Sequence, residues 1–183
     1  MHPVAIAGSR LTLREFQVGD VDALLAIYGD PVVVQHLSFE PRTREQVEAT
    51  VAHAIAAAQQ DERLDYSLAA VLRNGKLVAS ARLAIDVGHP LQSSAQIGFA
   101  LRGDQWGHGL GSETIGLLLR LGFEHLGVYR IWGARSPSNE ASARTMAKMG
   151  LVEEGVMRGH LRLADGLWRD SVVHSILAPE WSP

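Results

Sequence analysis

The first third of the chain has a hydrophobic pattern that predicts one strand followed by two helices. Residues 10–14 alternate with the two-residue period of a strand. Asp20 is a favourable N-cap, and the apolar stripe behind it predicts a helix that ends at Gly29. Thr43 and Gln46 have the spacing of a capping box and predict the start of a second helix.

The remaining two thirds alternate between strand and helix patterns. Strands are predicted at 66–72, 77–85, 95–101, 128–135, 152–163 and 167–177, with hairpin turns at Asn74-Gly75 and Asp165-Gly166. Helices are predicted over 112–126, closed by Gly127, and over 139–149, stopped by Gly150. This order of elements favours an α+β fold with a mixed, mostly antiparallel sheet over a doubly wound parallel fold. We expect a single domain over residues 1–183.

Composition narrows the class of protein. With 46% hydrophobic and 20% charged residues the chain is typical of globular proteins. A net charge of −3 gives no electrostatic reason to expect a nucleic-acid partner. The chain has no cysteine, which excludes disulfides, a cysteine nucleophile and thiolate metal sites. The N-terminus does not resemble a signal peptide, and no apolar run is long enough to span a membrane, so we expect a cytoplasmic protein without a membrane partner.

A glycine loop between the strand at 95–101 and the next helix is the most informative segment. Gly107, Gly109 and Gly111 occupy alternate positions. Glycine allows the backbone to approach a ligand closely, and the first turn of a helix presents free N–H groups to phosphate. The loop therefore predicts a pyrophosphate cradle. A dinucleotide fingerprint requires a third glycine where Ser112 stands, and no Gly-Lys-Ser/Thr of a P-loop follows.

The segment Trp106–Glu113 is similar to the acyl-CoA loop, R/Q-x-x-G-x-G/A, of the GNAT superfamily of N-acetyltransferases. Trp106 in the first place resembles the branch of the Rim-type ribosomal-protein N-terminal acetyltransferases. A second segment, Asn139-Glu-Ala-Ser142 followed by Lys148-Met-Gly150, is similar to that branch's N-x-x-S-x-x-x-x-x-K-x-G-F. Leu151 replaces the usual phenylalanine. The resemblance covers nearly the whole chain.

The resemblance implies helices on both faces of the sheet and two strands, 95–101 and 128–135, that splay apart around acetyl-CoA as cosubstrate. A backbone N–H near Phe99 or Ala100 would stabilise the oxyanion while a primary amine attacks directly. No metal is implied. The residues that it places at the cofactor are Phe99, Ala100, Leu101, Trp106, Gly107, His108, Gly109, Leu110, Gly111, Ser112, Asn139, Ser142 and Arg144.

Asn139 and Ser142 are the candidate catalytic residues. Both stand at the start of a predicted helix, where Asn139 could serve only as an N-cap. The resemblance implies that Ser142 donates to the departing thiolate and that Asn139 could hold the pantetheine. Arg144 could meet the nucleotide phosphates, although exposed helical arginines are usually only solvated.

The sequence does not identify the residue that acts as general base. Gln96 stands where many relatives carry a glutamate, and an amide cannot accept the proton. Glu113 is explained as a partner of the helix dipole, and Asp170 as a structural hydrogen-bond acceptor. Water leading to a distant carboxylate would also serve.

The eight histidines have no i, i+4 pair, so we expect no metal site. His36, in the acceptor half of the chain, is the one histidine that we single out as an acceptor contact. Residues 14–65 hold ten acidic and four basic residues, whereas the rest of the chain has a net charge of +3. This division predicts a cationic acceptor with Glu40 as its contact.

Three functions stay open. The chain could acetylate a protein or peptide N-terminus, or a small amine such as an aminoglycoside, a peptide antibiotic or a polyamine. It could also be a CoA-binding regulatory module without turnover, for which Gln96 is the indication. Monomer and homodimer are both compatible with the sequence.

Overall fold

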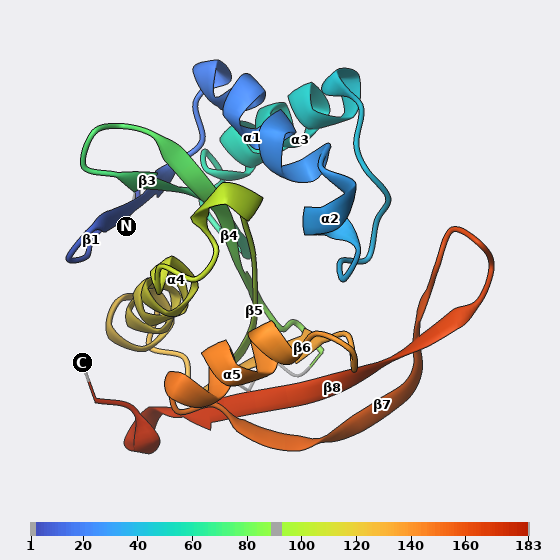
Figure 1. Cartoon of the computed structure of the whole chain (residues 1–183). Coiled ribbons are helices and arrows are strands. Elements are labelled where there is room, and N and C mark those ends of the chain that lie inside the picture. Colours follow the sequence, from blue (N-terminus) through green and yellow to red (C-terminus); the bar gives the residue numbers. More distant parts are fainter. Residues whose placement is uncertain (1–2, 89–92, 183) are drawn as a thin grey trace.

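The computed structural model describes residues 3–88 and 93–182, in which eight strands form one mixed sheet (Figure 1). The strand order is β1-β2-β3-β4-β5-β6-β8-β7, and every neighbouring pair is antiparallel except β5 with β6. This confirms the predicted α+β fold. The strands are β1 (Ala5–Ala7), β2 (Leu11–Glu15), β3 (Asp65–Leu72), β4 (Leu77–Ile85), β5 (Ser94–Leu101), β6 (Arg130–Arg135), β7 (Val152–Arg162) and β8 (Trp168–Leu177).

Helices cover both faces of the sheet (Figure 1). On one face lie α1 (Val21–Tyr28), α2 (Pro31–Val34) and α3 (Arg44–Ala57), and on the other lie α4 (Leu110–Arg120) and α5 (Glu140–Lys148). Each face buries its own apolar cluster. Leu83 and Ile115 belong to the cluster under α4, and Leu24 and Val51 to the cluster under α1 and α3. The sheet is therefore the middle layer of three, and β4 is buried at five successive residues, 77–81, because both of its faces are covered.

Asp20 occupies the N-cap position of α1, as predicted, but its side chain does not cap the helix. Asp20 ends a short 3-10 turn (Val18–Asp20), and its side chain makes no capping bond to α1. Its carboxylate accepts two bonds from the guanidinium of Arg14, at 2.7 and 2.8 Å, and one from the backbone N–H of Gln17. A nearly buried carboxylate needs such partners, and Arg14 and Gln17 provide them.

Two short elements were not predicted, β1 and α2. Three and four residues are too few for a hydrophobic period to be recognised. At α2 the sequence does contain a start signal, because Asp30 accepts the N–H of Val32 and Pro31 occupies the first turn.

Several predicted boundary signals are confirmed. Thr43 and Gln46 form the capping box of α3. Gly75 in the β3–β4 turn, Gly127 after the α4 region and Gly150 after α5 have φ of +84°, +67° and +83°, a conformation that favours glycine. Within the described residues, no helix is long and apolar enough to cross a membrane.

Candidate active site

The centre of the sheet opens between its two parallel strands. β5 and β6 are paired only where Ser94–Gln96 lies beside Arg130–Trp132. Beyond these residues the two strands diverge, although β5 stays paired with β4 as far as Leu101. At the point of divergence Gly133 allows close approach, since a Cβ there would lie 3.3 Å from the carbonyl oxygen of Ile97. The predicted splay is therefore present.

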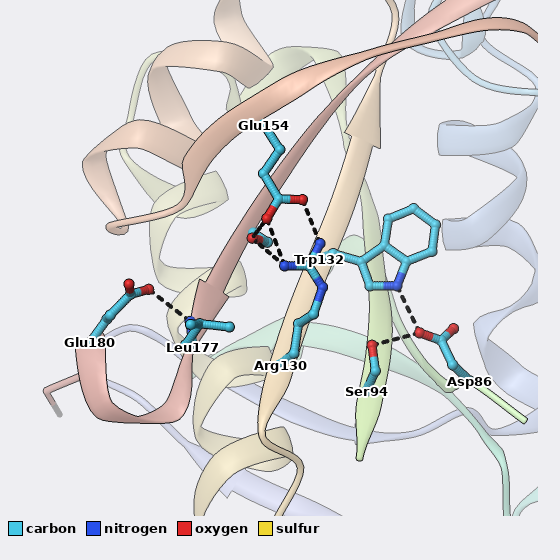
Figure 2. Close-up of polar contacts among 8 residues, drawn as sticks. Asp86, Ser94, Arg130, Trp132, Glu154, Leu177 and Glu180 are labelled. Atoms are coloured by element: carbon cyan, nitrogen blue, oxygen red, sulfur yellow. Dashed lines mark hydrogen bonds and ion pairs between the residues drawn. The ribbon is translucent and has the colours of Figure 1, made fainter. Parts of the chain in front are cut away.

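Polar contacts hold the closed end of this opening (Figure 2). One carboxylate oxygen of Asp86 accepts from the hydroxyl of Ser94 on β5 at 2.7 Å and from the indole N–H of Trp132 on β6 at 2.8 Å. On the other side of β6, Arg130 donates to Glu154 of β7 at 2.7 Å. These contacts keep the strands together below the opening, so the separation begins at a defined residue pair.

The strand register decides which backbone groups of β5 face the opening. Asp86 donates to Ser94, and Arg102 donates to Val78, so the even-numbered residues of β5 belong to the ladder with β4. The N–H of Ala100 is therefore used inside the sheet. The N–H groups of Phe99 and Leu101 point towards the opening. Of the two predicted oxyanion donors, only Phe99 has its N–H on the side of the opening.

The glycine loop closes one end of the opening. Gly107 and Gly109 have φ of +79° and +74°, and α4 begins at Leu110, two residues earlier than predicted. Outside the helix ladder, the six N–H groups from Gly107 to Ser112 donate no hydrogen bond to any described residue. Six such N–H groups in sequence form a concave anion site. The earlier start buries the side chain of Leu110 in the core and leaves only its N–H for a ligand.

The loop is fastened from two sides. The indole N–H of Trp106 donates to the carbonyl oxygen of Leu101 at 2.9 Å, which ties the loop to the end of β5. The guanidinium of Arg10 donates to the carbonyl oxygen of His108 at 2.7 Å. The His108 side chain is exposed and does not line the cavity described below. His108 therefore contributes its backbone to the loop.

Glu113 connects the first turn of α4 to the start of β2. One carboxylate oxygen accepts the N–H groups of Arg10 and Leu11 at 2.7 and 2.9 Å, and the other accepts the Arg10 guanidinium at 2.8 Å. Burial raises the pKa of Glu113, but these hydrogen bonds outweigh it and leave the pKa below its ordinary value. A carboxylate held in this way positions the loop and is a poor proton acceptor.

The third wall comes from α5. Asn139 caps the helix by accepting the N–H of Ser142 at 3.0 Å, so the structural role weighed for Asn139 is present. The half-buried Ser142 lines the cavity, and its hydroxyl makes no hydrogen bond within the described part of the chain. Arg144 and Lys148 lie exposed at the cavity rim, without an ion pair among the described residues.

Arg135 and His174 support this wall and were not recognised in the sequence. Arg135 lines the cavity and donates to the carbonyl oxygens of Ser136 and Pro137, at 3.2 and 2.9 Å, just before α5. Its Nε donates to Nε2 of the buried His174 at 3.1 Å. Burial and the neighbouring Arg135 lower the pKa of His174, which keeps the ring neutral. Arg135 and His174 meet only because β6 pairs with β8, and no local signal in the sequence indicates this contact.

The end of α2 and the segment after it form the wall on the opposite face. Val33, His36 and Leu37 line the cavity there, and His36 is half-buried. Glu40 lines a neighbouring groove instead, together with Phe39 and Arg162. Of the two predicted acceptor contacts, the structure brings only His36 into the same cavity as the glycine loop and Ser142.

These walls enclose one cavity of about 580 Å³. Its lining combines the opening of the sheet, the glycine loop, α5 and the segment after α2. The predicted residues that line it are His36, Phe99, Ala100, Leu101, Trp106, Gly107, Gly109, Gly111, Ser112, Asn139, Ser142 and Arg144. Such a cavity can hold an elongated molecule with an anionic end at the loop and a reactive end between the strands.

Gly111 shows how closely the walls are packed. A Cβ at this position would lie 3.3 Å from the ring of Phe99 and 3.5 Å from the side chain of Thr145.

Among residues 3–88 and 93–182, no group of three or more His, Cys, Asp or Glu side chains could hold a metal ion. Two of the eight histidines, His2 and His89, lie outside the described residues.

Asp170, weighed as a base in the sequence, has a structural partner in the final hairpin. Its carboxylate accepts the N–H of Gly159 at 2.7 Å, next to an irregularity in the β7–β8 register. Gln96 lies half-buried on the paired part of β5. Neither residue lines the cavity.

Known proteins are similar to this chain in sequence and in fold. The family model of the acetyltransferase (GNAT) domain matches residues 10–152. The chain is similar to the uncharacterized N-acetyltransferase YoaA of Bacillus subtilis strain 168, with 29% identity over 98% of this chain and 99% of YoaA. It is also 32% identical to the ribosomal protein uS5-alanine N-acetyltransferase of Escherichia coli K12, over 48% of this chain and 44% of that protein.

Among solved structures, RimJ of Mycobacterium smegmatis in complex with CoA-disulfide has a TM-score of 0.83 and 21% identity. The match covers all of this chain and 91% of RimJ. At this identity the similarity establishes a shared fold, including the mixed sheet derived above.

Proposed function

The chain belongs to the GNAT family of N-acetyltransferases, and we propose that it transfers an acetyl group from acetyl-CoA to the amine of a peptide or protein N-terminus. The observation that carries the proposal is the continuous cavity, which joins the three glycines of the loop and Ser112 to an opening between two parallel strands. The loop suits a pyrophosphate, and the opening suits an extended thioester arm.

The residues present fit CoA in three respects. The N–H groups from Gly107 to Ser112 would hold the pyrophosphate without a charged side chain. The exposed cations Arg144 and Lys148 at the rim would meet the remaining phosphate charge. The N–H of Leu101, which the register turns towards the opening, would pair with an amide carbonyl of the pantetheine arm.

The chemistry that this arrangement supports is direct transfer. The amine nitrogen attacks the thioester carbonyl carbon, and the N–H of Phe99 donates to the oxygen that becomes negative. The C–S bond then breaks, and the hydroxyl of Ser142 donates a proton to the departing sulfur. Asn139 contributes by capping α5, which holds Ser142 at the cavity. No covalent intermediate on the protein is involved.

The similarity to the uS5-alanine N-acetyltransferase, which is named for its action on a protein alanine, supports a peptide or protein N-terminus as the acceptor. The charge asymmetry of residues 14–65 gives weaker support for a cationic acceptor than the sequence suggested. The groove beside the cavity holds one acid and one base, Glu40 and Arg162. A preference for cationic acceptors therefore stays a prediction.

The test is release of free CoA thiol from acetyl-CoA with a panel of acceptors. The panel contains matched basic and acidic peptides with free N-termini, the same peptides with blocked N-termini, and small polyamines and aminoglycosides. We expect turnover that requires a free peptide N-terminus. If cationic peptides react faster, the difference in kcat/KM should shrink when salt screens the charges. Turnover confined to small amines would contradict the peptide acceptor, and no thiol release at all would contradict the enzyme.

A matched binding control uses the glycine loop. Gly109→Glu would place a strained, negatively charged side chain in the cradle, because position 109 has φ of +74°. We expect loss of measurable acetyl-CoA binding in calorimetry while the far-UV circular dichroism stays unchanged. Undiminished affinity in this variant would move the cofactor site away from the loop.

A further inference from the structure

The transfer reaction also needs a group that accepts a proton from the acceptor amine. An amine reaches the cavity mostly as an ammonium ion, which cannot attack a carbonyl carbon until it loses a proton. The residues that line the cavity include no Asp, Glu, Tyr or Cys within the described part of the chain. Their titratable members are His36, Arg135, Arg144 and Lys148. Only the histidine of this group accepts a proton near neutral pH.

We propose that His36 is the general base, its imidazole removing the proton from the acceptor amine before attack. This inference rests on the proposed function, because it assigns a residue of the same reaction. His36 follows α2, on the face of the sheet that carries α1 and α3, whereas α4 and α5 lie on the opposite face (Figure 1). The cavity passes through the sheet opening and reaches both sides. His36 is therefore opposite the glycine loop, on the side left for the acceptor.

The backbone on both sides of His36 is fixed. The N–H of Leu37 donates to the carbonyl oxygen of Val34 at 2.7 Å, and the carbonyl oxygen of Leu37 accepts from Arg169 of β8 at 3.1 Å. Asp30 and Pro31 define the start of α2. A base must be held within hydrogen-bond reach of its proton, and a loop tied to both α2 and β8 satisfies this requirement better than a free loop would.

The surroundings of His36 keep its ring neutral. Burial lowers the pKa of His36, and the positive charge of Arg169 lowers it further. Arg169 has no carboxylate partner among the described residues, and its Nε is buried without a hydrogen bond, so no anion offsets its charge. The other charged groups on the cavity wall, Arg135, Arg144 and Lys148, are also cations. Glu40 lines the neighbouring groove.

The proton balance closes with two transfers. Neutral His36 takes one proton from the ammonium group and becomes imidazolium, which leaves a neutral amine. The amine forms the C–N bond, the C–S bond breaks with its electron pair on sulfur, and the second proton of the nitrogen passes to sulfur through the hydroxyl of Ser142. The products are the amide, CoA thiol and imidazolium, and the imidazolium returns its proton to water.

The first experiment compares His36→Gln with the wild type, using His53→Gln as a matched control. His53 is exposed on α3 and does not line the cavity. We expect kcat of His36→Gln at pH 7 to fall by about 100-fold, the low end of general-base effects, with little change in acetyl-CoA affinity. The loss should shrink as pH rises, because the amine then deprotonates without help. Added imidazole should restore part of the rate.

The second experiment measures the ionisation of His36 directly. Removing the positive charge in Arg169→Met should raise the pKa of His36, seen by NMR titration of the imidazole, and should shift the acid limb of kcat/KM to higher pH by the same amount. A purely structural Arg169 would change the rate without this matched shift.

The outcomes separate the two proposals. If the wild type releases CoA thiol and His36→Gln has the same kcat and the same pH profile, the assignment of His36 is overturned and the enzyme stands. If the wild type releases no thiol with any acceptor of the panel, the proposed function fails, and the assignment of His36 fails with it.

Discussion

The contact between Glu113 and the start of β2 leads to a quantitative prediction. In Glu113→Ala the N–H groups of Arg10 and Leu11 lose their acceptor, and Arg10 loses its ion pair. Leu11 is 1% exposed, so its unsatisfied N–H costs about 1–3 kcal/mol. The N–H of Arg10 can bind water and costs about 0.5–1.5 kcal/mol. The ion pair involves a half-exposed arginine and contributes about 0–1 kcal/mol.

Together these losses predict a free energy of unfolding lower by about 3 kcal/mol, a large part of the roughly 5–15 kcal/mol of a typical domain. Urea unfolding, followed by circular dichroism, measures this change. Because Arg10 also holds the carbonyl of His108, we expect acetyl-CoA affinity to weaken by about fivefold, which corresponds to roughly 1 kcal/mol. Glu113→Gln keeps an acceptor oxygen and should lose about half as much stability.

Glu124→Ala is the matched control, because Glu124 pairs with Arg120 near the end of the same helical segment at 3.5 Å and is exposed. Its free energy of unfolding should change by less than about 0.5 kcal/mol. If Glu113→Ala costs no more than this control, the calculation above is refuted. If Glu113→Gln loses catalysis while its stability and acetyl-CoA affinity stay intact, Glu113 acts as a base and not as a positioning residue.

Two further predictions concern the wall formed by α5. Ser142→Ala should lower kcat by about 10- to 100-fold with little change in acetyl-CoA affinity, because the hydroxyl acts when the thiolate leaves; an unchanged kcat would leave Ser142 a structural residue. The lowered pKa of His174 means that its neutral form stabilises the fold at pH above the ordinary histidine value of 6.5, and that this stabilisation is lost as pH falls below it. His174→Gln, which can still accept from Arg135, should therefore lose less stability than the wild type between pH 7 and pH 5, as measured by urea unfolding. Parallel pH curves would contradict this role.

Elements whose signals are local could be predicted from the sequence. The capping box at Thr43 and Gln46 and the glycine that ends α5 act within one helical turn, and both are as expected. The glycine loop was also recognised, since positive φ and a following helix are local properties. The start of α4 was misplaced by two residues, because Gly109 provides the N-cap without a side chain that could signal it.

Groups that meet across the sheet could not be predicted in the same way. Whether Phe99 or Ala100 presents its N–H to the opening depends on the register between β4 and β5, which the side chains of either strand alone do not specify. The contact of Arg135 with His174 depends on the pairing of β6 with β8. The partner of Glu113 is the start of β2, about one hundred residues earlier in the chain.

The sequence by itself determined the order of the longer elements, the glycine loop and the family of the chain, because each is written in short motifs and hydrophobic periods. Only the tertiary structure decided which residues share the cavity. His36, Phe99 and Ser142 come from three elements far apart in the chain, and they meet because strand register and packing on two sheet faces sum many weak, non-local contacts. The same packing leaves the described cavity wall without a carboxylate and brings His36, the proposed proton acceptor, into it.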